Sequence, residues 1–234
     1  MNWLRVTVAL YRRVFGRAAA LIARNWPVLG SLFLYTFVLR VALEFVPLLG
    51  FIGGMLFSLL WAGCVGSFLY LVEMMVRTSR VSLEDLRRSA GAYLWDVVGV
   101  TFVVWLGFRL VSMVLSGTPQ GPILFLCVQL IVMVFFNAVP ELIYLGRASS
   151  FELLRQSYVF IGDNWIEWFP ATGALAMLVL ALASVPADSF PLALAKAAVV
   201  ALLVAYAMVV RGLLFLELDA STRRSRAFRY RVGE

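Results

Sequence analysis

The sequence predicts an all-α, polytopic membrane protein with six transmembrane helices. Hydrophobic residues make up 63% of the 234 residues and charged residues only 14%, whereas about a quarter of the residues are charged in an average soluble domain. Six apolar stretches each approach the roughly 20 residues that a helix needs to cross a hydrocarbon core of about 30 Å. The two stretches of each pair are connected by a short turn that contains proline or glycine, so we expect helical hairpins.

The expected spans form three hairpins. They cover residues 28–46 and 51–76, then 97–116 and 123–145, and finally 168–185 and 192–218. The turns within the hairpins fall near Pro47, Pro119 and Pro186. Pro140 lies inside the fourth span, and we expect a bend there because proline is a common cause of helix kinks.

An amphipathic segment precedes each hairpin. Residues 2–24 place an apolar group near one helical face and arginines over much of the rest, which is typical of a helix that lies in the membrane interface. The apolar group comprises Leu4, Val8, Tyr11, Phe15 and Ile22. A solvated helix docked on a partner is the alternative interpretation. The second segment opens with Ser82 and Asp85, an N-cap signal, and the third, residues 150–162, ends at Asp163-Asn164-Trp165.

The arginines predict the orientation of the chain. The three tight turns contain no lysine or arginine, whereas the amphipathic segments and the tail contain many. By the positive-inside rule, both termini and all amphipathic segments are therefore cytoplasmic. We expect this basic side to contact anionic lipid head groups through Arg12, Arg13, Arg17, Arg87, Arg88, Arg223 and Arg224. A net charge of +7 could also suggest nucleic acid, but no separate basic domain exists to bind it, so we expect no nucleic-acid partner.

Three tryptophans indicate an internal repeat. Trp26, Trp95 and Trp165 are 69 and 70 residues apart (95 − 26 and 165 − 95), and each opens a hairpin at the interfacial depth that indole rings favour. Three parallel hairpin repeats, approximately residues 2–76, 77–145 and 146–218, would then surround an axis along the membrane normal. Residues 219–234 form a basic tail, and a single membrane domain covers residues 1–234. Chance spacing among the seven tryptophans is the alternative.

Polar residues inside the expected spans are candidate sites. Arg40 and Arg109 each lie 14 residues after a repeat tryptophan, about 21 Å into the membrane. Intramembrane charges are costly and usually face a cavity or a partner. Arg40 could instead snorkel to the outer head groups or pair with Glu44. Asn137 is a further candidate, although a polar group beside Pro140 more often satisfies a kinked backbone.

An acidic residue ends each hairpin. These residues are Glu73, Glu141 and Glu217. In the simpler interpretation they pair with nearby cytoplasmic arginines such as Arg77 or Arg147. In the alternative they form an acidic ring that lines a shared cytoplasmic vestibule.

One stretch resembles a recurring element of bacterial membrane proteins. It comprises Pro140-Glu141, Gly146-Arg147-Ala148, the run FELLRQS at residues 151–157, and Asn164-Trp165. These proteins include the membrane domain attached to some glycerophosphodiester phosphodiesterases and related six-span proteins. The resemblance implies a six-span bundle with interfacial helices in a bacterial inner membrane. The hydrolase of those enzymes is a separate soluble domain that has no counterpart here, so the resemblance implies no catalytic residue.

The residues favour a non-catalytic function. The chain has no histidine, and Cys64 and Cys127 lack metal or redox spacing. No phosphate-binding loop or hydrolase motif is present, so we expect no enzyme activity, metal or cofactor. The first hypothesis is a scaffold or accessory subunit whose basic cytoplasmic collar binds anionic lipid, another membrane protein or a second copy of the chain. The alternative is a transporter or channel for an anionic solute or lipid along the axis between the repeats, with Arg40 and Arg109 attracting the anion.

Overall fold

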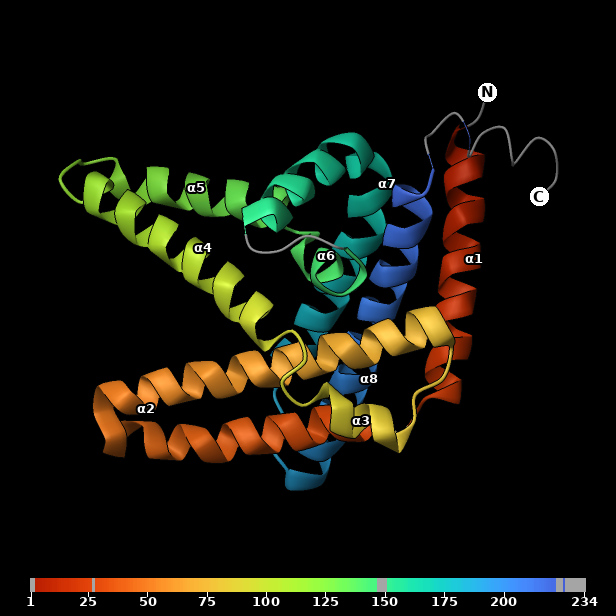
Figure 1. Cartoon of the computed structure of the whole chain (residues 1–234), viewed down its shortest axis with the longest axis horizontal. Helices are drawn as coiled ribbons and strands as arrows, with labels where there is room; N and C mark the ends of the chain where they lie inside the picture. The colour runs from red at the N-terminus through yellow and green to blue at the C-terminus, as the bar shows by residue number, and fades with distance from the viewer. Residues whose placement is uncertain (1–2, 27, 147–150, 222–224, 226–234) are drawn as a thin grey trace.

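The protein is built from helices. A computed structural model describes residues 3–26, 28–146, 151–221 and 225, and none of these residues lies in a strand. The helices are α1 (Trp3–Arg24), α2 (Val28–Thr78), α3 (Leu83–Ser89), α4 (Leu94–Leu115), α5 (Gly121–Phe135), α6 (Val139–Leu145), α7 (Phe151–Ser184) and α8 (Phe190–Asp219) (Figure 1).

Five helical stretches of the described chain are long and apolar enough to cross a membrane. They are α2, α4, the run Gly121–Leu145 that contains α5 and α6, α7, and α8. Since a helix satisfies its backbone hydrogen bonds internally, it is one of the few structures that can span lipid. The architecture is therefore that of an all-α membrane protein.

The longest helix, α2, is itself a hairpin. Its backbone leaves the helical region at Gly50, where φ is 55° and ψ is −127°, and its two limbs lie side by side in Figure 1. Glycine adopts a positive φ without the steric cost that a Cβ imposes. Gly53 is also required, because a Cβ there would lie 2.7 Å from the carbonyl oxygen of Val46. The chain thus reverses at Gly50, close to the turn expected near Pro47.

The bend expected near Pro140 is a complete interruption. α5 ends at Phe135, and α6 begins at Val139. Pro140 occupies the first turn of α6, where its missing N–H costs no hydrogen bond. The carbonyls of the interrupted segment find side-chain donors: Ser157 Oγ donates to the oxygen of Phe135 at 2.8 Å, and Arg211 donates to that of Asn137 at 2.6 Å.

Helix α1 packs against α8. Its buried residues recur at helical spacing as Thr7, Val14, Ala18, Leu21 and Ile22, and Asn25, directly after the helix, is buried too. The Tyr206 hydroxyl of α8 donates to the Phe15 carbonyl at 3.2 Å. The expected apolar face is thus partly wrong, because Val8 is 62% exposed. Ile22 of the expected face is buried, but the small Ala18 and the polar Thr7 are buried as well, so hydrophobicity alone identifies the buried side only in part. In the described chain, this buried side of α1 is covered by α8.

The short helix α3 confirms the N-cap signal. Ser82 Oγ accepts from the backbone N–H of Asp85 at 3.1 Å, and the Asp85 carboxylate accepts from the N–H of Ser82 at 2.8 Å. These hydrogen bonds hold the pKa of Asp85 below its ordinary range. Leu83, the first residue of α3, is exposed. The connection from α3 to α4 lies close to α2 at Gly66, where an added Cβ would lie 2.3 Å from the Ala92 oxygen.

Helix α7 continues through the expected boundary at residues 163–165. It runs unbroken from Phe151 to Ser184. Asn164 ends no helix here, because its side-chain amide donates to the carbonyl of Phe160 one turn earlier, at 3.1 Å. The third amphipathic segment and its span are therefore one helix.

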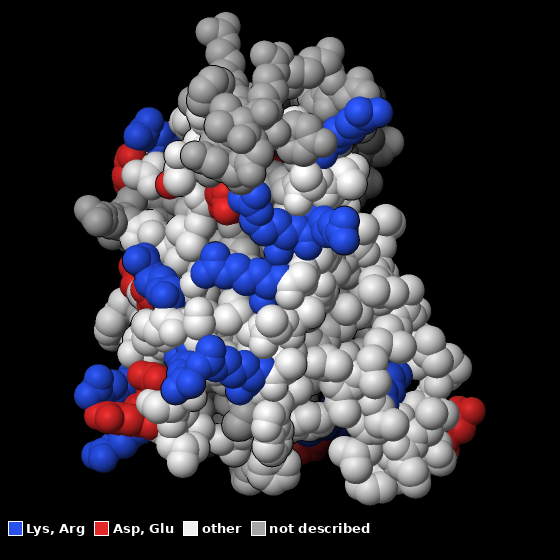
Figure 2. Space-filling view, turned by 90° about the vertical axis from the view of Figure 1, so that its right-hand side faces the viewer, with Lys and Arg blue, Asp and Glu red and all other residues white. Residues whose placement is uncertain are grey.

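The core lies at one end of the helices. Residues with no exposed surface include Leu71 and Met75 of α2, Trp168 of α7, and Val209 and Leu214 of α8. The opposite ends of the hairpins are exposed and apolar, as at Leu48, Val114, Ile123 and Phe190. The α2 and α4–α5 hairpins diverge toward their turns in Figure 1. The face at the core end of the helices, seen in Figure 2, carries many basic side chains.

Candidate functional site: a buried ion pair beneath an arginine-rich face

A buried charge pair joins α6 and α8 in the interior. Arg211 of α8 donates to both carboxylate oxygens of Glu141 in α6, from Nε at 2.7 Å and from an Nη at 2.8 Å. The Glu141 side chain is wholly buried, and that of Arg211 is 15% exposed. Such bidentate geometry is the strongest form of the arginine–carboxylate contact. Glu141 also lies in the first turn of α6, where the helix dipole favours a negative charge.

Asn137 and Trp168 complete the cluster around Arg211. The guanidinium donates to the Asn137 backbone oxygen at 2.6 Å and to its side-chain oxygen at 3.2 Å. Trp168 Nε1 donates to the same side-chain oxygen at 2.9 Å. The Trp168 ring lies 5.2 Å from the guanidinium carbon, a distance at which a cation–π attraction operates. The backbone oxygen of Asn137 therefore binds Arg211, and its side-chain oxygen binds both Arg211 and Trp168.

This cluster is chemically closed. Four hydrogen bonds engage Arg211, whose guanidinium has five N–H groups. Its charge is neutralised by Glu141, and its face is covered by Trp168. The arrangement joins the α5–α6 break, α7 and α8, which is a structural function. It offers little capacity to bind a further anion.

A second polar cluster surrounds Glu73 near the end of α2. Arg77 lies 3.0 Å from one carboxylate oxygen, and the Tyr93 hydroxyl donates to the other at 2.5 Å. Arg77 also donates to the Leu145 carbonyl at 3.2 Å. Burial, and then the Glu73 carboxylate, raise the pKa of Tyr93 well above its ordinary value, so the phenol stays a donor. Glu73 is thus paired with Arg77, the arginine that the simpler interpretation of the acidic residues named.

The three acidic residues at the hairpin ends have different surroundings. Glu141 pairs with Arg211, whereas Arg147, the partner that the sequence suggested, lies outside the described residues. Glu217 lines a cavity of about 260 Å³ between α1 and α8, together with Arg13, Arg17, Leu213 and Leu216. In the described part of the chain, the three glutamates of the predicted acidic ring therefore have different neighbours.

The intramembrane arginines predicted from the sequence are exposed. Arg40 lies on the first limb of α2 and Arg109 on α4. Glu44, one turn after Arg40, is exposed too. Within the described residues Arg40 and Glu44 form no ion pair with each other, and neither arginine lines the cavities described here.

The arginines expected to contact lipid lie on the surface where the structure describes them. Arg12, Arg13 and Arg17 of α1 and Arg87 and Arg88 of α3 are exposed, and Arg88 pairs with Glu84 at 2.6 Å. Arg223 and Arg224 lie outside the described residues. The three repeat tryptophans, Trp26, Trp95 and Trp165, are also exposed, at 69%, 74% and 55%.

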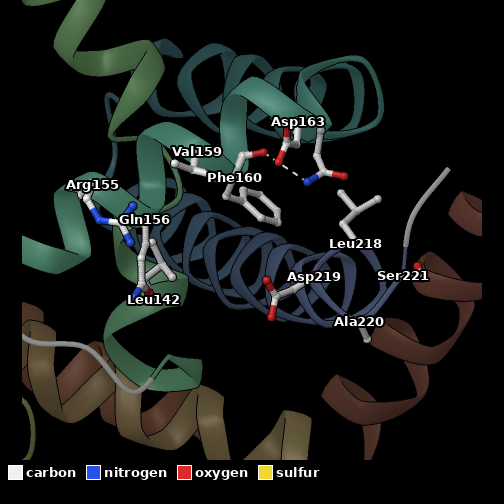
Figure 3. A pocket seen from close by; sticks show the side chains of 11 residues that line it. Leu142, Arg155, Gln156, Val159, Phe160, Asp163, Leu218, Asp219, Ala220 and Ser221 are labelled. Atoms are coloured by element: carbon white, nitrogen blue, oxygen red, sulfur yellow. Dashed lines mark hydrogen bonds between the residues drawn. The ribbon is translucent and has the colours of Figure 1, made fainter.

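A larger cavity opens between α7 and the end of α8. It has a volume of about 540 Å³. In Figure 3, Asp163 projects from α7 and Asp219 from α8, while Arg155 and Gln156 lie toward one end. Arg155 is held by Glu152, which accepts from its Nε at 2.8 Å. The lining mixes both charge signs, and no cluster of metal-ligand residues occurs in the described chain.

Sequence reasoning missed Arg211 and Trp168. A signal for Arg211 was present, because it is the one charged residue between Lys196 and Glu217, and an isolated charge in an apolar span is a candidate site. Trp168 carried no comparable signal, since tryptophans are also placed at interfaces. Asn137 was singled out as a polar residue that satisfies a kinked backbone, but its described side-chain hydrogen bonds go to the side chains of Trp168 and Arg211.

No family model matches the chain, and neither the curated proteins nor the solved structures contain a match.

Proposed function

We propose that the chain is a non-catalytic integral membrane protein, a scaffold or accessory subunit that binds anionic phospholipid through its arginine-rich face. One observation carries the proposal. The arginines of α1 and α3 are exposed, and Figure 2 shows basic side chains gathered on the face of the molecule that lies opposite the α2 and α4–α5 turns of Figure 1, while the hairpins expose apolar side chains. A basic surface at the base of apolar hairpins suits the negative cytoplasmic leaflet.

The proposed topology has six spans. The two limbs of α2 count as two, and α4, α5 with α6, α7 and α8 supply the others. Positive residues mark the cytoplasmic side, so both termini lie there. The chain is assigned to a bacterial inner membrane on the resemblance of residues 140–165 to membrane domains of that origin.

Equivalent hydrogen bonds support the three-hairpin repeat. Ser89 Oγ lies 2.5 Å from Ser67 Oγ, and Ser157 Oγ donates to the Phe135 carbonyl at 2.8 Å. The members of each pair are separated by 22 residues, and the second pair lies 68 residues after the first (135 − 67). The same interval relates Glu73 to Glu141. Each serine fastens an amphipathic segment to the preceding span, so the second and third units share this attachment.

A lipid head group fits the cavity between α1 and α8. Its lining includes Arg13 and Arg17 of α1, and its α8 wall includes Leu213 and Leu216. Arginine forks match phosphate oxygens, and an apolar wall accommodates the adjoining acyl chain.

The transport hypothesis gains no support from the charged residues. Arg211 has its hydrogen bonds committed to Glu141 and Asn137, and Arg40 and Arg109 are exposed on different helices.

Phospholipid retention tests the proposal. The protein is purified in mild detergent from membranes containing phosphatidylglycerol, and the bound phospholipid is extracted and quantified. We expect the R12Q/R17Q variant to lose at least half of the bound phosphatidylglycerol. The matched control R40Q/R109Q also removes two positive charges, but from the hairpins, and it should retain the lipid. Equal retention by wild type and R12Q/R17Q contradicts lipid binding by this face, and selective loss in R40Q/R109Q favours an anion site in the hairpins.

A further inference from the structure

The first limb of α2 presents an exposed, heptad-spaced stripe. Its members are Gly30, Leu34, Phe37, Val41, Glu44 and Leu48, and all of them are exposed. The intervals alternate between four and three residues, which is the period of a left-handed helix–helix seam. A Cβ added at Gly30 would meet no atom within 4 Å, so a neighbouring helix could approach closely there. The limb runs along the lower edge of the molecule in Figure 1.

Two charges of opposite sign lie on or beside this stripe. Glu44 is one of its members, and Arg40 borders it one turn earlier. At 1.5 Å per residue, Arg40 lies about 15 Å along the helix from the turn at Gly50, well inside the thickness of a bilayer. Charges at such depth are almost always paired or face a polar cavity. Within the described residues, no hydrogen bond or ion pair engages either side chain.

The order of the two residues disfavours an ion pair between them within the helix. In the described chain, ion pairs join neighbouring turns of one helix at Glu73–Arg77, Glu84–Arg88 and Glu152–Arg155. In each of them the glutamate precedes the arginine, which is the favourable order relative to the helix dipole. Arg40 and Glu44 have the reverse order. Their charges are therefore available to another molecule.

We propose that this stripe is the interface of a homodimer, in which Arg40 of each copy pairs with Glu44 of the other. A two-fold axis along the membrane normal places identical surfaces against each other, so two arginines and two glutamates meet around it with no net charge. Arg40 and Glu44 differ in depth by about 6 Å, which the long arginine side chain spans. A second copy fits better than lipid, because an acyl chain neutralises neither charge. The proposal is independent of lipid binding by the arginine-rich face.

Cysteine cross-linking tests the interface directly. In a C64S/C127S background, V41C places a thiol on the stripe and L43C places one off it. Val41 and Leu43 are matched controls, since both are aliphatic and they are 42% and 45% exposed. In vesicles of phosphatidylcholine, a neutral lipid, we expect V41C to form disulfide-linked dimers at least ten times faster than L43C. Equal rates, or a protein that is monomeric in these vesicles, overturn the proposal.

Charge exchange then tests the ion pair. R40E and E44R, each in the V41C background, bring like charges together across the interface and should reduce cross-linking at least five-fold. The double variant R40E/E44R restores complementary charges and should restore the rate. If a single reversal fails to fold, R40Q and E44Q supply the comparison with smaller expected losses. Unchanged cross-linking in every charge variant overturns the pairing of Arg40 with Glu44.

Discussion

Replacing Arg211 by methionine removes one member of the buried pair. The Glu141 carboxyl group, which has no exposed surface, is then left in an apolar interior without a counter-ion. The Asn137 backbone oxygen at the α5–α6 break also loses the donor that now lies 2.6 Å away. We therefore expect R211M to be among the most damaging single substitutions in the chain.

The expected loss follows from the burial of both partners. Leaving one member of a buried ion pair unpaired costs about 3–5 kcal/mol, a large share of a typical unfolding free energy of about 5–15 kcal/mol. The double variant R211M/E141M removes both charges, and such replacements range from neutral to stabilising by about 1–4 kcal/mol. The unsatisfied Asn137 oxygen offsets part of that recovery, at about 1–3 kcal/mol. R211K keeps the charge but loses the bidentate fork, so it should lie between wild type and R211M.

Unfolding by sodium dodecyl sulfate in mixed micelles, followed by far-UV circular dichroism, measures these differences. We expect R211M to lose more stability than R211M/E141M. Two outcomes contradict this: a loss below about 1 kcal/mol in R211M, or a loss in R211M/E141M that equals the sum of the losses in R211M and in the single variant E141M. Either would mean that the pair is not electrostatically coupled.

Further variants test other contacts by the same unfolding measurement. G212A should lose about 1–3 kcal/mol of unfolding free energy by overpacking, because its Cβ would lie 2.6 Å from the Tyr144 hydroxyl. Adding Y144F removes that oxygen and should recover most of the loss. A G212A variant as stable as wild type contradicts this packing. S82A should lose about 1 kcal/mol with the α3 cap, seen as faster hydrogen exchange confined to residues 83–89. The pKa of Asp85 is lowered in the folded state by its bonds to Ser82, so its stabilising contribution is complete above about pH 4 and falls as the pH drops through the lowered value. The difference in Tm between wild type and D85N should shrink accordingly at low pH, and a difference that does not vary with pH contradicts the cap.

Local features of the fold were predictable where a residue type dictates the backbone. The N-cap at Ser82 was identified from its hydroxyl and the acid three residues later. The turn near Pro47 followed from the chemistry of proline and glycine, whereas near Pro140 only a bend was predicted and the helix is interrupted there. Asp163 and Asn164 led to a wrong prediction of a helix end, because both residue types are common there. Here the Asn164 amide donates to the Phe160 carbonyl within the helix. That choice depends on the packing of α7 and is not encoded locally.

The candidate site was predictable only in part. Asn137 was identified as a polar residue at depth and Glu141 as an acidic residue at a hairpin end, but their common partner Arg211 lies 70 residues or more away in sequence. Periodicity locates residues on one helix and gives no information on which helices meet. The buried face of α1 shows the same limit, since the small Ala18 is buried while the larger Val8 is exposed.

The sidedness of the arginine-rich face is tested most directly by thiol labelling in intact cells. Two variants in the C64S/C127S background are compared. R88C places a thiol on α3 within this face, and Q120C places one in the α4–α5 turn. Both positions are exposed. With a membrane-impermeant maleimide added outside the cells, we predict labelling of Q120C and none of R88C until the membrane is permeabilised. Labelling of R88C in intact cells would contradict a cytoplasmic location for the arginines, and with it the proposed binding of lipid at that leaflet.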